Sequence, residues 1–377
     1  MATYCCPAYE NDSTGSSHEG HEPSTPPCPS DWRRLVALAD EELAQVDIVE
    51  SNLDCAAGLP AAERIDRDLC LHTIEHMADQ TRFNTANAFK AFERRPEEWN
   101  HSPGIFRIHV LVCTLQREFG ARYNSAKIPF EVPLETDDSF IHGIIQGQGG
   151  TCASLPPLYV AVGRRLGYPL KLVSAACVNR YMHLFVRWDD PEGERFNIEV
   201  NKGGLNCPPD DHYRQGPYHT QPAWEETGSI LSSMKPRQEL ACFLAQRAAR
   251  WRQLGQARLE AEALAWAVTL APDNVFHRQT LLQVLDGWHE SLKAIKPPAF
   301  PALTIVSPEP GLPRIVPEAI ERDLIGLTVA ELLLKDPVND RTWWQPLRRG
   351  AHVHPRPAQV IVHCRPDGGY DLQTHCS

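Results

Sequence analysis

The apolar residues of this 377-residue chain follow two different periods, and the change from one to the other most constrains its fold. Between residues 30 and 120 they recur every three to four positions, as on the buried face of a helix. After residue 170 they alternate in short runs, as in antiparallel strands. The sequence therefore predicts an α+β domain in which helices precede a small sheet.

Three helical runs are expected before residue 120. The first begins after Ser30, a residue type that favours the N-cap of a helix, and ends near Gly58. The second covers about residues 61–92. The third covers about residues 105–119, where Gly120 is the stop signal.

A further helix and three strands are expected between residues 152 and 200. Apolar positions at helical spacing run from Leu155 to Leu166. Strand-like runs follow at residues 170–173, 181–188 and 196–200, and a turn sequence separates the last two. This order predicts one helix packed beside antiparallel strands.

The composition divides the chain into four segments. Residues 1–29 are rich in Ser, Thr, Pro, Glu and Gly and predict a disordered tail, because they cannot bury enough apolar surface to offset the entropy of ordering. Residues 30–235 form the domain with the sheet. Residues 236–295 are helical, and residues 296–377 carry twelve prolines and only short strand-like pieces, at 302–306 and 359–364. No fold is predicted for this last segment.

The helical segment 236–295 resembles tetratricopeptide repeats. Trp251, Gly255, Ala267 and Pro272 fall near the offsets of one repeat unit. About three repeats are needed for independent stability, so we expect these helices to pack on the preceding domain.

The charge balance argues against nucleic-acid binding, since 37 Lys and Arg face 48 Asp and Glu, a net charge of −11. No apolar stretch approaches the ~18 residues of a membrane span, and the N-terminus lacks the pattern of a secretion signal. We therefore expect a cytoplasmic protein that binds neither nucleic acid nor membranes. Its 12 cysteines are then expected to be free thiols rather than disulfides.

One of the cysteines, Cys152, is a candidate nucleophile. Cys152 follows Gly149 and Gly150 on a loop, and the Pro-Pro pair beyond it makes Ser154 the expected N-cap of the next helix. The positive end of a helix favours a thiolate. Five other cysteines have apolar neighbours and are expected in the core: Cys55, Cys70, Cys113, Cys177 and Cys242.

His183 is the candidate base for this thiol. It lies on the expected strand 181–188, on the face opposite to the apolar Leu184, so it can face a cleft. Cysteine catalysis also needs a group that orients the base. Asn197 and Glu199 project from one face of the next strand, and either residue can hold the imidazole.

These residues resemble the transglutaminase-like superfamily, a class of papain-like cysteine enzymes. The resemblance rests on Gly-Gly-Thr-Cys152, on Arg-Leu-Gly-Tyr-Pro at the end of the next helix, on His183-Leu-Phe-Val and on Glu199. More narrowly, the chain is similar to bacterial proteins of this class that have a helical N-terminal region and tetratricopeptide-like C-terminal helices. The resemblance implies a papain-like core with Cys152 as nucleophile, His183 as base and Glu199 at a position that is usually Asp, with Asn197 as the alternative.

The resemblance implies a thiol-dependent hydrolase, a protease or amidase without a cofactor or metal, that acts on a protein or peptide. Gln148 resembles the side-chain donor to the oxyanion, with Gln146 as the alternative. If an amine released the thioester, the protein would instead be a protein-glutamine transglutaminase. If the chemistry has been lost, it would be a scaffold that binds a protein partner through its tetratricopeptide-like helices.

A second chemistry is suggested by His72-Thr-Ile-Glu75-His76, which fits the inverted zinc-peptidase pattern. Both histidines would lie on one helical face, with Glu75 as the base. No third ligand is evident in the sequence, so the better interpretation is a polar helix face.

Overall fold

The computed structural model describes residues 32–127, 132–147, 149–177, 182–201, 203–218, 220–293, 302–306, 357–364 and 370–376. The chain divides into two units, Met1–Ser30 and Asp31–Ser377. The tail predicted for residues 1–29 lies outside the described residues. None of the helices within the described ranges combines the length and the apolar character that a membrane crossing requires.

The first predicted helical run is three helices rather than one. They are α1 (Arg33–Val36), α2 (Asp40–Leu43) and α3 (Ile48–Ala56). The run breaks before α3 because Asp47 has extended backbone and its side chain accepts a hydrogen bond from the Val49 N–H, which starts a new helix.

The second and third predicted helices are present with shifted ends. Helix α4 (Arg67–Arg94) starts at its cap Asp66, after a 3₁₀ turn η1 (Ala62–Arg64). Helix α5 (Pro103–Cys113) is capped by Ser102 and continues as a π-helical turn η3 (Thr114–Glu118). Shorter elements complete this region: η2 (Pro96–Trp99), η4 (Ser125–Lys127), α6 (Thr136–Ser139) and α7 (Ile141–Ile145).

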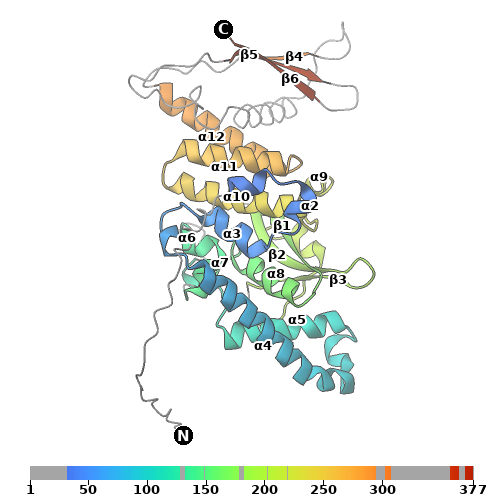
Figure 1. Ribbon diagram of the computed structural model, residues 1–377. Coiled ribbons are helices and arrows are strands. Elements are labelled where there is room, and N and C mark those ends of the chain that lie inside the picture. Colours follow the sequence, from blue (N-terminus) through green and yellow to red (C-terminus); the bar gives the residue numbers. More distant parts are fainter. Residues whose placement is uncertain are drawn as a thin grey trace, which may run out of the picture. The chain divides into compact units, whose positions relative to one another are not determined.

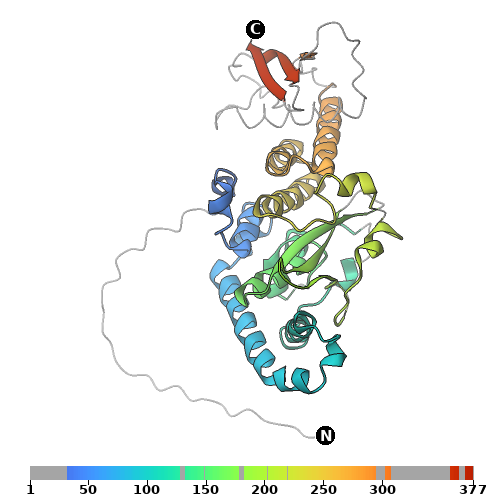
Figure 2. The ribbon, with the colours of Figure 1, turned by 90° about the vertical axis from the view of Figure 1, so that its right-hand side faces the viewer.

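Helix α8 (Leu155–Arg165) packs on an antiparallel sheet of three strands in the order β1-β2-β3 (Figures 1 and 2). The strands are β1 (Leu170–Ala176), β2 (Met182–Asp189) and β3 (Arg195–Ile198). Leu184 and Val186 on β2 point into the main core with α8. Phe185, on the other face of β2, belongs to a separate apolar cluster with Tyr213. The alternation predicted for this strand is confirmed, and it leaves His183 on the Phe185 face.

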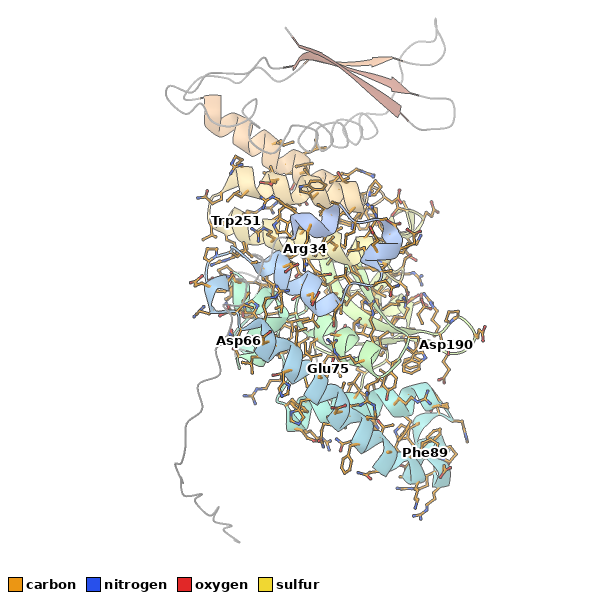
Figure 3. The ribbon with its side chains drawn as sticks, in the orientation of Figure 1. Arg34, Asp66, Glu75, Phe89, Asp190 and Trp251 are labelled. Atoms are coloured by element: carbon orange, nitrogen blue, oxygen red, sulfur yellow. The ribbon has the colours of Figure 1, made fainter. Side chains whose placement is uncertain are left out.

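Three helices follow the sheet, after the short η5 (Asp210–Arg214) and α9 (Pro222–Glu225). They are α10 (Pro236–Gln253), α11 (Ala257–Leu270) and α12 (Val275–Lys293). Helix α10 belongs to the main core, where the Arg247 guanidinium donates to the carbonyl oxygens of Cys55 and Ala57 and Glu239 pairs with Arg164. Trp251 on the same helix is labelled in Figure 3 and packs against this core. The docking expected for these helices is therefore observed for α10 and for α11, whose Ala267 and Leu270 also belong to the main core, whereas α12 packs on α11 in a second cluster.

The C-terminal segment contains a second sheet of three strands. They are β4 (Ala302–Val306), β5 (Pro357–Cys364) and β6 (Tyr370–Cys376). Strand β4 is parallel to β5, and β6 is antiparallel to β5. The two strand pieces expected here are thus confirmed. Taken with the helices and the first sheet, the described residues form an α+β protein.

Candidate active site

The loop that carries Cys152 is pinned to a neighbouring backbone segment. The Asn124 N–H donates to the Gly150 carbonyl oxygen at 2.8 Å, and the Gly150 N–H donates to the Arg122 carbonyl oxygen at 2.9 Å. Gly149 has φ +78, and a Cβ atom there would lie 3.3 Å from the Asn124 Cβ atom. Glycine therefore permits both the turn and the close approach of the two segments.

Hydrogen bonds on the other side of Cys152 tie its turn to helices α6 and α10. Ser154 is the N-cap, as predicted, and its hydroxyl and that of Thr151 both donate to the Asp138 carbonyl oxygen, at 2.8 and 2.7 Å. The Gln246 side chain on α10 donates to the Ala153 carbonyl oxygen at 3.2 Å. Cys152 itself is half-buried in this rigid turn.

The imidazole of His183 lies between Cys152 and Glu199. Its Nε2 atom is 2.8 Å from the Glu199 Oε2 atom. Since a ring has only two nitrogens, Nδ1 is the one left for the Cys152 thiol. Burial lowers the pKa of His183, but hydrogen bonds with Cys152 and Glu199 outweigh it and raise this pKa to about 9. The ring is therefore easily protonated.

Both oxygens of the Glu199 carboxylate are hydrogen-bonded. Oε2 also accepts from the Tyr213 hydroxyl at 3.3 Å, and Oε1 accepts from the Asn201 side chain at 2.6 Å. Burial raises the pKa of Glu199, yet its hydrogen bonds with His183 and Asn201 lower it below the usual value overall. Glu199 is 3% exposed, so an ionised carboxylate is held against the ring away from solvent.

Asn197, the other candidate for orienting His183, contacts different groups. Its Oδ1 atom accepts from the Arg187 Nε at 2.7 Å, and its Nδ2 donates to the Asp210 carboxylate at 2.8 Å. Asn197 pairs with Arg187 across β2 and β3. The strand expected over 196–200 ends at Ile198, which pairs with Val186, and Glu199 is the next residue, with its N–H donating to the Asn206 carbonyl oxygen. Glu199 therefore reaches the ring from the end of β3, and Asn197 lies about 6.5 Å further along the strand.

A buried arginine stabilises the segment that supports Glu199. The Arg187 side chain is fully buried, and its guanidinium pairs with Asp210 at 2.6 Å and donates to the Leu231 carbonyl oxygen at 2.8 Å. Asp210 begins η5, whose Tyr213 stacks on Phe185 with ring centroids 4.1 Å apart. These residues were not selected from the sequence. The available signal was Arg187 itself, because an arginine on the cleft face of a strand needs a buried partner.

Aromatic rings cover His183. The Tyr218 ring centroid is 4.9 Å from that of His183, and the Tyr213 centroid is 6.2 Å from it. Burial raises the pKa of the Tyr218 phenol, and the nearby Glu199 charge adds to this. Sequence reasoning gave no reason to select either tyrosine, because both belong to an irregular segment.

Gln148 was expected as the side-chain oxyanion donor, with Gln146 as the alternative. Gln148 lies outside the described residues. The Gln146 side chain donates to the Arg64 carbonyl oxygen at 2.7 Å. Gln146 is thus engaged by a different part of the chain.

The residues of the zinc-peptidase pattern are exposed on α4 and contact other groups. Glu75, labelled in Figure 3, pairs with Arg165, and the His76 ring packs on Phe119 with centroids 5.2 Å apart. Among the residues that the structure describes, no three His, Cys, Asp or Glu side chains are grouped as a metal site.

The expectation that five cysteines lie in the core is correct for Cys55, Cys70 and Cys242, which are buried. Cys113 and Cys177 are only half-buried. Cys177 also differs from a core cysteine because it lies at the candidate site. Burial and the neighbouring Cys152 raise the pKa of its thiol, and its sulfur accepts a hydrogen bond from the His183 backbone. It lies at the site because β1 ends beside the start of β2.

No protein-family model, curated protein or solved structure matches this chain.

Proposed function

We propose that the chain is a thiol-dependent hydrolase with a papain-like core of the transglutaminase-like class, in which Cys152, His183 and Glu199 act on a peptide or carboxamide carbonyl. The observation that carries the proposal is the 2.8 Å contact between the buried His183 and Glu199, with the Cys152 thiol at the same ring. This is the arrangement of nucleophile, base and orienting group that acyl transfer requires.

In the proposed mechanism each residue has one step. His183 takes the proton of the Cys152 thiol, and the ionised Glu199 stabilises the imidazolium that results. The thiolate attacks the carbonyl carbon, forming the S–C bond and moving an electron pair to the carbonyl oxygen. When this intermediate collapses, the C–N bond breaks and the His183 imidazolium gives its proton to the leaving amine. A thioester on Cys152 remains.

Water is the proposed acceptor of the acyl group. His183, neutral after the first half-reaction, can take a proton from water as it attacks the thioester carbon, which releases the acid and regenerates the thiol. Transfer to an amine would need an additional binding site for that amine. Hydrolysis is therefore the outcome that the residues of the site support by themselves.

Alkylation by iodoacetamide at a pH of about 6 tests the proposal, because only an activated thiolate reacts quickly there. We expect Cys152 to be labelled much faster than free glutathione at the same pH, which serves as the reference for an unperturbed thiol. Cys207 is exposed, but partial burial of its thiol raises the pKa of Cys207 to about 11, so it serves only as an internal control for slow labelling. The His183→Gln variant should slow labelling of Cys152 and leave Cys207 unchanged. Labelling of Cys152 in the parent protein no faster than that of glutathione would refute the proposed activation.

A further inference from the structure

The ring of Tyr218 lies against the imidazole of His183, and the proposed mechanism has not used it. The two ring centroids are 4.9 Å apart, and the ring planes are tilted by 43°. The rings of Tyr213 and Phe185 are further from His183, at 6.2 and 6.4 Å. Of these three rings, Tyr218 therefore acts most strongly on the imidazole.

The contact involves the imidazole ring rather than its nitrogen atoms. Nε2 of His183 lies 2.8 Å from the Glu199 carboxylate, and Nδ1 is left for the Cys152 thiol. The phenol ring of Tyr218 therefore competes with neither partner. Such a contact stabilises the charged imidazole, because the electrons of an aromatic ring attract a cation within about 6 Å of the ring centroid.

Tyr218 is held in place by neighbours other than His183. Its N–H donates to the Gln215 carbonyl oxygen at 3.4 Å, and its ring packs on that of Tyr213, with centroids 5.2 Å apart. Tyr213 is buried and stacks on Phe185 of β2, and Tyr218 packs partly buried against the cluster that they form. The phenol ring is thus already in position when His183 becomes charged.

The titratable groups around the proposed ion pair keep one charge state near neutral pH. Burial opposes the ionisation of Glu199, but its hydrogen bond with His183 keeps the pKa of Glu199 below the usual value. Burial raises the pKa of each of the neutral acids there: Cys177, Tyr213 and Tyr218. Their titration does not obscure that of the proposed ion pair.

We infer that Tyr218 is a positioning residue whose ring stabilises the charged form of His183 and, through it, the thiolate of Cys152. This inference rests on the proposed thiol chemistry. The imidazolium is then stabilised by two groups, the carboxylate of Glu199 and the ring of Tyr218. The ring adds to the effect of the carboxylate without the cost of burying a second charge.

Two residues placed at position 218 separate the electron distribution of the ring from its shape. Tyr218→Phe keeps the aromatic face and loses only the hydroxyl. Pentafluorophenylalanine at the same position keeps nearly the same shape, but its fluorine atoms withdraw electrons from the face, which then no longer attracts a cation. The same two residues at position 168 are the matched control, because Tyr168 is also half-buried but packs on Trp188 in the main core.

The measurement is the pH dependence of Cys152 alkylation by iodoacetamide. We expect Tyr218→Phe to keep the parental midpoint and pentafluorophenylalanine to raise it by about one pH unit, since the loss of a cation–π contact shielded from water changes an equilibrium about tenfold. The two residues at position 168 should give equal midpoints. The exposed His212 ring lies 5.3 Å from that of Tyr218, and histidine changes charge near neutral pH, so the comparison is repeated in His212→Gln, where we expect the same shift.

Equal midpoints for the two residues at position 218 would overturn the role of the Tyr218 ring and leave the proposed function intact. A shift that disappears in His212→Gln would also overturn it, because the effect would then belong to His212. If Cys152 of the parent protein is not alkylated rapidly, the proposed function fails, and this inference fails with it.

Discussion

Replacing Glu199 by Gln removes one negative charge and leaves the shape of the side chain. The lost interaction is the charge-assisted hydrogen bond of 2.8 Å that the Glu199 carboxylate accepts from His183. This carboxylate is 3% exposed. Such bonds contribute about 1.5–3 kcal/mol, and burial favours the upper part of that range. At about 1.36 kcal/mol for each factor of ten, a loss of about 2.7 kcal/mol lowers the rate of acylation roughly 10²-fold.

The assay is the pH dependence of Cys152 alkylation, measured beside acylation by p-nitrophenyl acetate. Glu199→Gln should move the midpoint of the alkylation profile to higher pH, because the imidazolium that accompanies the thiolate is less stable without the carboxylate. The matched control is Glu239→Gln, since Glu239 is 4% exposed and pairs with Arg164 away from the site. The control should lose stability without moving the midpoint.

A folded Glu199→Gln that keeps both the midpoint and the acylation rate of the parent would show that Glu199 does not orient His183. Asn197→Ala is not a suitable comparison, because Asn197 binds the buried Arg187 and its loss would disturb the fold. A midpoint that moves equally in Glu199→Gln and Glu239→Gln would show a general effect of charge rather than an orienting role.

Three further outcomes are expected. The pKa of His183 is raised to about 9, so its imidazolium is present below that pH. Above it, the rate of amide cleavage should fall about tenfold per pH unit, which a pH–rate profile would detect. Arg187→Met should lower the free energy of unfolding by about 3 kcal/mol in urea titrations, since it leaves the buried Asn197 Oδ1 atom and the Leu231 carbonyl oxygen without their donor; an unchanged midpoint would contradict this. A chain ending at Lys235 should aggregate in size-exclusion chromatography, because removing α10 exposes core residues; a soluble, active monomer would show that α10 is dispensable.

Local pattern was sufficient to predict much of the fold. The alternation along 181–188 placed His183 and Leu184 on opposite faces, and the Pro-Pro pair placed Ser154 at the N-cap. The break before Ile48 was missed because Asp47 looks like any polar residue within a helical period. Its capping role depends on backbone geometry that a period does not reveal.

The nucleophile, the base and the two candidate orienting residues could be predicted because each lies in or directly beside a regular element, α8, β2 or β3. The choice between Asn197 and Glu199 depends on the register of β2 and β3, which the turn between them does not fix by itself. Tyr213 and Tyr218 reach the site from the segment that follows β3. Such contacts leave no periodic signal, so these residues could be found only from the structure.

The most direct test of the central claim is to trap the acyl-enzyme with p-nitrophenyl acetate and to locate the acetyl group by peptide mass mapping. We expect a stoichiometric thioester on Cys152 in the parent protein, no thioester in Cys152→Ala, and slow formation of the thioester in His183→Gln. We also expect that Cys152→Ala stays folded, because Cys152 is half-buried in a turn held by its neighbours. An acetyl group that accumulates instead on Cys207, or equally on several cysteines, would contradict the account.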